Sequence, residues 1–185
     1  MVDIGGGTTE IAVISLGGMV INRSLRVAGD EMDEAIVNYM RTRYGMLIGE
    51  RSAEEVKIEI GSAYPTGKDD PATVVRGRDL STGLPKSMKL GASEIREALT
   101  PIISEIVGAI QEVLEETPPE LLTDIVDRGV YLAGGGALIR GLDKKIAEET
   151  KLPVYISDDP LTTVVRGCGE VLENLDLLSK VKVTG

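Results

Sequence analysis

With 185 residues, 42% of them hydrophobic, the chain is long enough to bury one core, or one core with a smaller satellite. It carries 30 acidic and 20 basic side chains, so its surface is expected to repel nucleic-acid backbones. It has no histidine and a single cysteine, Cys168, which therefore lacks partners for a zinc site or for thiol catalysis and is expected to be a buried core residue. No apolar stretch reaches the length of a membrane span and no signal peptide precedes Asp3, which predicts a soluble, cytoplasmic protein.

The first motif is Asp3-Ile4-Gly5-Gly6-Gly7-Thr8-Thr9-Glu10, which lies between two apolar runs and predicts a strand, a glycine turn and a second strand. Glycines allow backbone N–H groups to converge on an anion, and the hydroxyls of Thr8 and Thr9 add donors at the same place. Asp3 ends the incoming strand, where it could hold a hydrated Mg²⁺, an ion that needs few protein carboxylates. An ordinary tight hairpin is the alternative for a glycine triplet taken alone.

Apolar runs and turn residues after this motif predict an antiparallel meander of three strands, over residues 11–16, 19–22 and 24–27. Asp30 is then expected to cap a helix whose apolar residues recur at helical spacing. Ser52 and Glu55 have the spacing of a capping box for a second helix, and Gly61 is expected to end it. Beyond a polar loop, two more strands are predicted, over residues 73–78 and 86–90.

A long helix is predicted over residues 93–116, and Pro101 inside it predicts either a kink or a break into two helices. After a short helix, a strand over residues 130–133 leads to Gly134-Gly135-Gly136. The remaining elements are a helix containing Leu138, Leu142 and Ile146, a strand over residues 154–157 and a helix over residues 161–172. Strands that alternate with helices favour parallel pairing, so these late elements are expected to extend the meander into one mixed sheet.

Two other glycine patterns do not fit known nucleotide loops. Five residues instead of four separate Gly61 from Gly67, and Asp69 stands where a P-loop needs Ser or Thr, so this segment is interpreted as a surface loop. The triplet Gly134-Gly135-Gly136 has Ile139 at the third glycine position of a dinucleotide motif, which makes a tight strand-to-helix turn its ordinary interpretation.

The segment VDIGGGTTEIAVI, residues 2–14, resembles the second phosphate loop of the actin and sugar-kinase superfamily and, more narrowly, of the bacterial MreB family. The resemblance continues in order along the chain, through AGDEMDEAI (28–36), IGERSAE (48–54), TPPEL (117–121) and GVYLAGGGAL (129–138). Essentially the whole chain is covered, and it corresponds to the C-terminal half of the family. The resemblance implies a ribonuclease-H-like (actin-like) α/β domain with a mixed sheet and helices on both faces, over residues 1–43 and 91–185, and a small inserted α+β subdomain over residues 44–90.

Members of this family hold ATP or ADP with Mg²⁺ between two related domains, and each domain supplies one hairpin. We therefore expect the first hairpin, the N-terminal domain and the residue that polarises the attacking water to lie outside this chain, and ATP hydrolysis by this chain alone is not expected. The resemblance implies Asp3 as the metal ligand and Thr8, Thr9 and Glu10 as catalytic residues. The nucleotide contacts that it implies are Gly5, Gly6, Gly7, Thr8, Thr9, Gly29, Asp30, Glu54, Lys57, Gly134, Gly135, Gly136 and Ala137.

Some of these residues also have ordinary structural interpretations. Asp30 reads first as a helix cap, and Glu54 and Lys57, one turn apart on a helix, usually form a solvated pair. For the Gly134 turn, small residues at a helix N-terminus suit an adenosine and its α-phosphate, which is where the family places this turn.

For function, the resemblance implies an ATP-binding protein that polymerises, meets other morphogenesis proteins and helps to set cell shape at the inner face of the membrane. The alternative is a stand-alone half-actin module that pairs with a copy of itself and binds little or no nucleotide. Half of a sugar kinase or chaperone ATPase is a third interpretation, disfavoured because TPPEL fits the MreB pattern and no sugar-site carboxylate can be identified. We also expect residues 161–178 to lie near a contact between copies, because their apolar side chains lack a partner surface.

Overall fold

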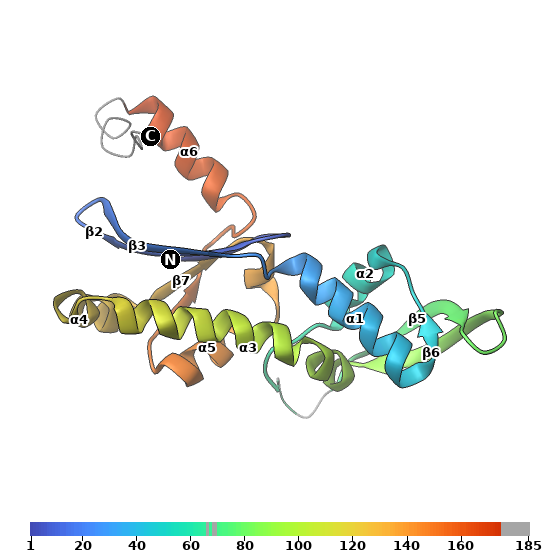
Figure 1. The fold of residues 1–185 in the computed structure, drawn as a ribbon. Helices are drawn as coiled ribbons and strands as arrows, with labels where there is room; N and C mark the ends of the chain where they lie inside the picture. The colour runs from blue at the N-terminus through green and yellow to red at the C-terminus, as the bar shows by residue number, and fades with distance from the viewer. Residues whose placement is uncertain (66, 68–69, 175–185) are drawn as a thin grey trace.

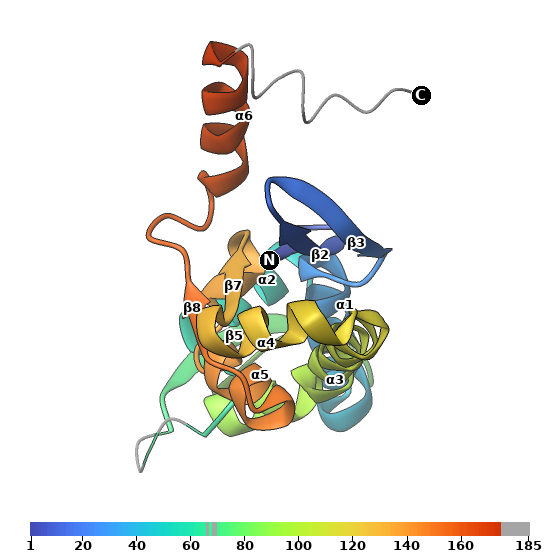
Figure 2. The ribbon, with the colours of Figure 1, turned by 90° about the vertical axis from the view of Figure 1, so that its left-hand side faces the viewer.

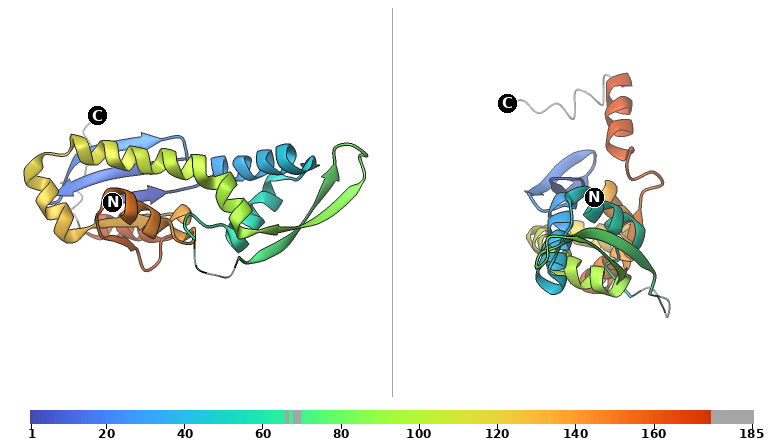
Figure 3. Two further views of the ribbon diagram at one scale, coloured as in Figure 1. Left: turned by 90° about the horizontal axis from the view of Figure 1, so that it is seen from below. Right: turned by 90° about the vertical axis from the view of Figure 1, so that its right-hand side faces the viewer.

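The computed structural model describes residues 1–65, 67 and 70–174. These residues form two sheets, one of five strands and one of three, that lie toward opposite ends of an elongated molecule (Figures 1 and 3). The strands of the larger sheet are β1 (Val2–Ile4), β2 (Thr9–Ser15), β3 (Gly18–Leu25), β7 (Val130–Ala133) and β8 (Val154–Ile156).

The larger sheet has the order β3-β2-β1-β7-β8. The first three strands pair antiparallel, whereas β7 runs parallel to β1 and β8 runs parallel to β7. The predicted mixed sheet is therefore confirmed, with the meander extended by the late strands. The prediction of two separate strands over residues 19–27 was wrong. Arg23, where the break was expected, pairs with Ile11 of β2, so residues 18–25 form one strand.

Helices lie on both sides of this sheet, but only those on one side pack against it (Figure 2). On one side lie α3 (Ala92–Glu116), α4 (Pro119–Arg128) and α5 (Leu142–Thr150), and Ile106 and Ile110 of α3 are buried in one core with Ile4 and Leu132 of the strands. On the other side, α6 (Thr163–Glu173) stands away from the sheet and has no buried residue. Cys168 lies on α6 and is exposed, so the expectation that it is buried was wrong.

Two predicted helix beginnings were wrong. α1 (Gly29–Tyr44) has Ala28 at its N-cap, and the Ala28 amide donates to Glu31 Oε2 at 2.8 Å, so Asp30 lies in the first turn instead of at the cap. α2 (Glu50–Ile60) has Gly49 at its N-cap, which places Ser52 inside the helix. The predicted end at Gly61 is confirmed, since the Gly61 amide donates to the Lys57 carbonyl at 2.9 Å.

Proline and glycine shape the second half of the chain. α3 is one helix through Pro101, and Figure 3 shows its first turns bent from the rest, so the kink occurred and the break did not. After β7, residues Gly135–Leu138 form a short 3-10 helix, η1, and α5 begins only at Leu142. Leu138 is therefore not in α5, because Ile139 is extended and Gly141 is left-handed, with φ of 74°.

The second sheet consists of β4 (Met46–Leu47), β5 (Ala72–Asp79) and β6 (Pro85–Gly91), all antiparallel, with α2 packed against β5. The two strands predicted over residues 73–78 and 86–90 are confirmed. These elements lie within or at the edge of the expected inserted segment, whose boundaries at residues 44 and 90 stay a prediction. No helix among the described residues combines the length and apolar character needed to cross a membrane.

Candidate functional site

The glycine loop after β1 is a tight hairpin held by its own backbone. The Gly5 amide donates to the Thr8 carbonyl at 2.9 Å, and β2 begins directly at Thr9. Gly6, Gly7 and Thr8 are exposed at the tip of the turn. The two glycines at the tip have no side chains, which lets an anion approach their backbone closely.

The first turn of α1 is joined to this loop from the side. The Gly29 amide donates to the Gly5 carbonyl at 3.1 Å, and the Asp30 amide donates to the Gly6 carbonyl at 2.8 Å. A Cβ atom on Gly7 would lie 3.5 Å from a carboxylate oxygen of Asp30, so that side chain borders the loop. The predicted residues Gly29 and Asp30 are therefore brought together with the predicted phosphate loop.

The glycine turn after β7 meets the same loop, because β1 and β7 are adjacent parallel strands that end together. A Cβ atom on Gly134 would lie 2.3 Å from the Ile4 carbonyl oxygen and 2.5 Å from Asp3 Oδ1, and one on Gly136 would lie 2.2 Å from Ile4 Cγ2. Only glycine permits this close approach. Gly135 is exposed, whereas Gly136 and Ala137 are buried behind the turn, so a ligand here would meet the backbone of Gly134 and Gly135 first.

Asp3 lies at the meeting point of the two glycine turns. Its pKa is raised, first because burial disfavours the carboxylate and second because of the negative charge of Glu10, its cross-strand partner. Glu10 is exposed and accepts a hydrogen bond from Ser24 Oγ, which is next in line across the sheet. The described residues contain no group of three or more acidic or cysteine side chains that could enclose a metal. One carboxylate does fit Mg²⁺ that is held mainly by water and phosphate oxygens.

The two loop threonines have different surroundings. Thr8 is exposed at the tip of the hairpin. Thr9 is fully buried, and its hydroxyl donates to the Val27 carbonyl at 2.7 Å, which ties β2 to the chain just before α1. A contact between the Thr9 hydroxyl and a phosphate would require this bond to break, so the structure gives Thr9 a structural role and leaves the Thr8 hydroxyl free of such a tie.

This difference predicts opposite behaviour for two matched variants. Thr9→Val keeps the side-chain shape but leaves the Val27 carbonyl without its donor, and we expect it to lower the unfolding free energy by about 1 to 2 kcal/mol. Thr8→Val should leave the melting temperature within a degree or so, since exposed substitutions change stability by less than about 0.5 kcal/mol. Thermal melts of both variants test this, and equal destabilisation by the two would contradict the assignment.

On the far side of α1, Lys57 of α2 is tied into the structure. Its Nζ donates to the Gly29 carbonyl at 2.9 Å and to Asp33 Oδ2 at 2.7 Å, and both side chains are only 12% exposed. Glu54, one turn earlier, is exposed. Asp33 was not among the predicted site residues. Its signal was an acidic residue beside Met32 on the face that α1 buries.

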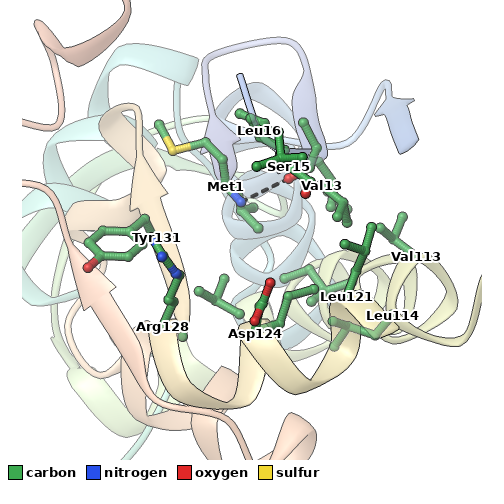
Figure 4. A pocket seen from close by; sticks show the side chains of 18 residues that line it. Met1, Val13, Ser15, Leu16, Val113, Leu114, Leu121, Asp124, Arg128 and Tyr131 are labelled. Atoms are coloured by element: carbon green, nitrogen blue, oxygen red, sulfur yellow. Dashed lines mark hydrogen bonds between the residues drawn. The ribbon is translucent and has the colours of Figure 1, made fainter. Parts of the chain in front are cut away.

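A separate apolar groove of about 550 Å³ lies at the opposite end of β1 from the glycine loop (Figure 4). It begins at Met1, whose amino group donates to the Ala12 carbonyl at 2.9 Å, and it runs between β2, the end of α3, α4 and the start of β7. Asp124 and Arg128 are its charged residues. Because it faces away from Asp3 and the loop, the groove is not part of the candidate nucleotide site.

A five-stranded mixed sheet, a glycine hairpin after its first strand and a glycine turn after the parallel neighbour are the features of an actin-like domain. Solved structures agree. A structure described as MreB5 of Spiroplasma citri bound to AMPPNP is 41% identical and covers 95% of this chain and 52% of its own, with a TM-score of 0.91. A MamK double helical filament is 26% identical, covers 94% of this chain and 53% of its own, and has a TM-score of 0.77.

The family model described as MreB/Mbl protein matches residues 1–180, so the chain belongs to the MreB/Mbl family. The cell shape-determining protein MreB of Escherichia coli (strain K12) is 54% identical over 177 residues, which are 96% of this chain and 51% of that protein. The cell shape-determining protein Mbl of Bacillus subtilis (strain 168) is 47% identical over 184 residues, 100% of this chain and 55% of that protein. The chain thus spans about half the length of these relatives.

Proposed function

We propose that this chain is the C-terminal half of an ATP-binding, filament-forming protein that controls cell shape. The observation that carries the proposal is the meeting of two glycine turns with Asp3 at the ends of the adjacent parallel strands β1 and β7. Ligands of α/β sheets bind outside the carboxyl ends of such strands. The similarity to MreB5, solved with AMPPNP and with ADP, supports a nucleotide at this place.

The residues take distinct parts in this proposal. The backbone of Gly5, Gly6 and Gly7 and the Thr8 hydroxyl donate to the phosphates, and Asp3 orients a hydrated Mg²⁺. When bound, that ion neutralises charge on the phosphate oxygens. Glu10, exposed on the strand after the loop, borders the cleft in which water would attack, and the other domain supplies the second hairpin. The contacts to the nucleoside fall to the first turn of α1, to Glu54 of α2 and to the Gly134 turn, through Gly29, Asp30, Glu54, Gly134 and Gly135, with Gly136 and Ala137 packed behind that turn.

Filament formation is supported by apolar residues at both ends of the long axis. Ile14, Leu16 and Met19 are exposed at the β2–β3 hairpin, and Leu80 and Leu84 are exposed at the β5–β6 turn toward the other end (Figure 3). Different patches at opposite ends favour head-to-tail contacts, which grow into filaments when they do not close into rings. In this proposal the protein acts at the inner face of the membrane, together with other morphogenesis proteins.

Calorimetry with Mg-ATP tests the nucleotide part of the proposal. Because one hairpin leaves half of the phosphate charge facing water, we expect a dissociation constant on the order of 1 mM, about 4 kcal/mol of binding, and negligible phosphate release. Chelation of Mg²⁺ and Asp3→Ala should each remove most of the signal. Asp127→Ala, which removes an equal charge from the exposed surface of α4, serves as the control.

Three results would count against this assignment. Absence of any ATP binding at millimolar concentrations would overturn nucleotide binding by this chain. Equal affinity for Mg-ATP in the wild type and in Asp3→Ala would overturn the metal role. Micromolar affinity together with measurable phosphate release would show that this half does not depend on a second domain.

A further inference from the structure

A buried ion pair joins the helix of the smaller sheet to the first helix of the larger one. Lys57 Nζ lies 2.7 Å from Asp33 Oδ2, and only 12% of each side chain is exposed (α1 and α2 in Figure 1). The second carboxylate oxygen of Asp33 is buried and has no hydrogen-bond partner among the described residues. Buried pairs are poor contributors to stability, and one with an unpaired oxygen is poorer still. This points to a positional role.

The ion pair holds the backbone at Gly29, where both the carbonyl and the amide group form hydrogen bonds. Lys57 Nζ donates to the Gly29 carbonyl at 2.9 Å. The Gly29 amide donates to the Gly5 carbonyl at 3.1 Å, and the next amide, of Asp30, donates to the Gly6 carbonyl at 2.8 Å. A Cβ atom on Gly29 would lie 3.2 Å from the Gly5 oxygen, so loop and helix are in close contact there. Lys57 on one side and the phosphate loop on the other therefore hold the same residue.

Lys57 is also the cation on which Asp33 depends. Burial raises the pKa of the Asp33 carboxyl, and the nearby charges of Glu54 and Asp30 raise it further, whereas the hydrogen bond and charge of Lys57 lower it. The ammonium group has three donors, and two of them are directed to Asp33 and to Gly29. Most of the hydrogen-bond donors of Lys57 are therefore already engaged within the protein.

We propose that Asp33 is a positioning residue for the phosphate loop, which acts by holding Lys57 against the Gly29 carbonyl and so fixing the turn of α1 that anchors Gly5 and Gly6. Asp33 itself touches no nucleotide. In this arrangement Lys57 serves as a brace between α2 and α1, instead of reaching for the ribose or adenine. The proposal rests on the proposed nucleotide function for its consequence, but its geometry concerns this chain alone.

The first test measures amide hydrogen exchange of the ligand-free chain by NMR. In Asp33→Asn, which keeps the shape of the side chain and removes its charge, the amides of Gly29 and Asp30 should exchange about 10-fold faster than in the wild type. The control is Glu34→Gln, which removes an exposed charge from the next position of α1 and should change neither rate. If both amides exchange in Asp33→Asn at the same rates as in the wild type, the proposal is overturned.

The second test separates a brace from a direct ligand. If Lys57 is a brace, Asp33→Asn weakens Mg-ATP binding by about 10-fold, since misplaced groups lose affinity steeply with distance. If Lys57 is instead a direct ligand, freeing it from Asp33 leaves the affinity unchanged or improves it, and the proposal fails. This readout applies only where the wild type binds Mg-ATP. A wild type that does not bind would overturn the proposed function, while hydrogen exchange would still decide the role of Asp33.

A double variant, Asp33→Asn with Lys57→Met, distinguishes positioning from stability. Removing both charges leaves none buried and unpaired, so the melting temperature should recover from its value in Lys57→Met alone. The Gly29 carbonyl still lacks its donor, so fast exchange at Gly29 and Asp30 should persist. Recovery of slow exchange together with the melting temperature would show that the pair is merely structural.

Discussion

Replacement of Gly134 with alanine is expected to destabilise this protein by about 3 kcal/mol or more, a large part of the roughly 5 to 15 kcal/mol that stabilises a domain. Gly134 has φ of 80° and ψ of 169°, a region that is essentially reserved for glycine and costs other residues about 1 to 3 kcal/mol. The new Cβ atom would also lie 2.3 Å from the Ile4 carbonyl oxygen. Relief of that overlap requires β1 and β7 to separate, which adds about 1 to 3 kcal/mol.

Urea unfolding of Gly134→Ala, monitored by circular dichroism, measures this effect. Gly108→Ala is the matched control, because the same methyl group there has no atom within 4 Å and the residue lies inside α3. It should stabilise the protein by about 0.5 to 1 kcal/mol. Similar midpoints for the two variants would show that the strand ends can separate without cost, and the close approach of the two glycine turns would lose its importance for the site.

The glycine hairpin could be predicted from sequence because its signals are local. A glycine triplet between two apolar runs has few conformations, and Asp3 and Thr8 occupy fixed places beside it. The mixed sheet also followed from local patterns, since alternation of strands and helices favours parallel pairing. In this way the part of the candidate site that belongs to one continuous segment was placed correctly relative to the strands.

The helix caps were missed because the expected residue types are absent from them. In α1 and α2, where Asp30 and Ser52 were predicted as caps, the N-cap residues are Ala28 and Gly49, which have no capping oxygen. In α1 the third residue, Glu31, accepts the hydrogen bond from the N-cap amide at 2.8 Å, and Glu94 does the same at the beginning of α3, whose N-cap is Gly91. Half of a capping box is therefore enough to begin α1, so a search for Ser or Asp at the cap chose the wrong position.

The roles of Thr9 and Lys57 depend on residues far away in sequence. Burial of Thr9 follows from its bond to Val27, and the position of Lys57 follows from its bonds to Asp33 and Gly29. The two carbonyl partners carry no sequence signal, because every residue has a carbonyl, and Asp33 differs from the other acidic residues of its segment only by its place beside Met32 on the buried face of α1. The tertiary fold alone decides which polar side chains face a ligand and which are already paired.

The surface of α6 is another apolar feature that this fold leaves open. The helix stands away from the sheet (Figures 1 and 2), and none of its residues is buried. Val165 and Leu172, two turns apart on one face, are 65% and 70% exposed. Leu161 and Val164 extend the same exposed stripe toward the sheet. The expected contact over residues 161–178 is described here only to residue 174. A stripe of this kind rarely stays bare on a soluble monomer.

We therefore expect the purified chain to self-associate through α6, with a symmetric dimer as the simplest product. Each apolar side chain buried in such a contact contributes about 1.5 to 3 kcal/mol, so the double variant Val165→Glu with Leu172→Glu should weaken association by about 100-fold or more. Gly167→Glu adds one such charge on the opposite face of α6, where a side chain meets no atom within 4 Å, and should leave association unchanged. Light scattering across the micromolar range measures the mass of all three proteins. A wild-type chain that stays monomeric throughout this range would show that α6 is not an association surface.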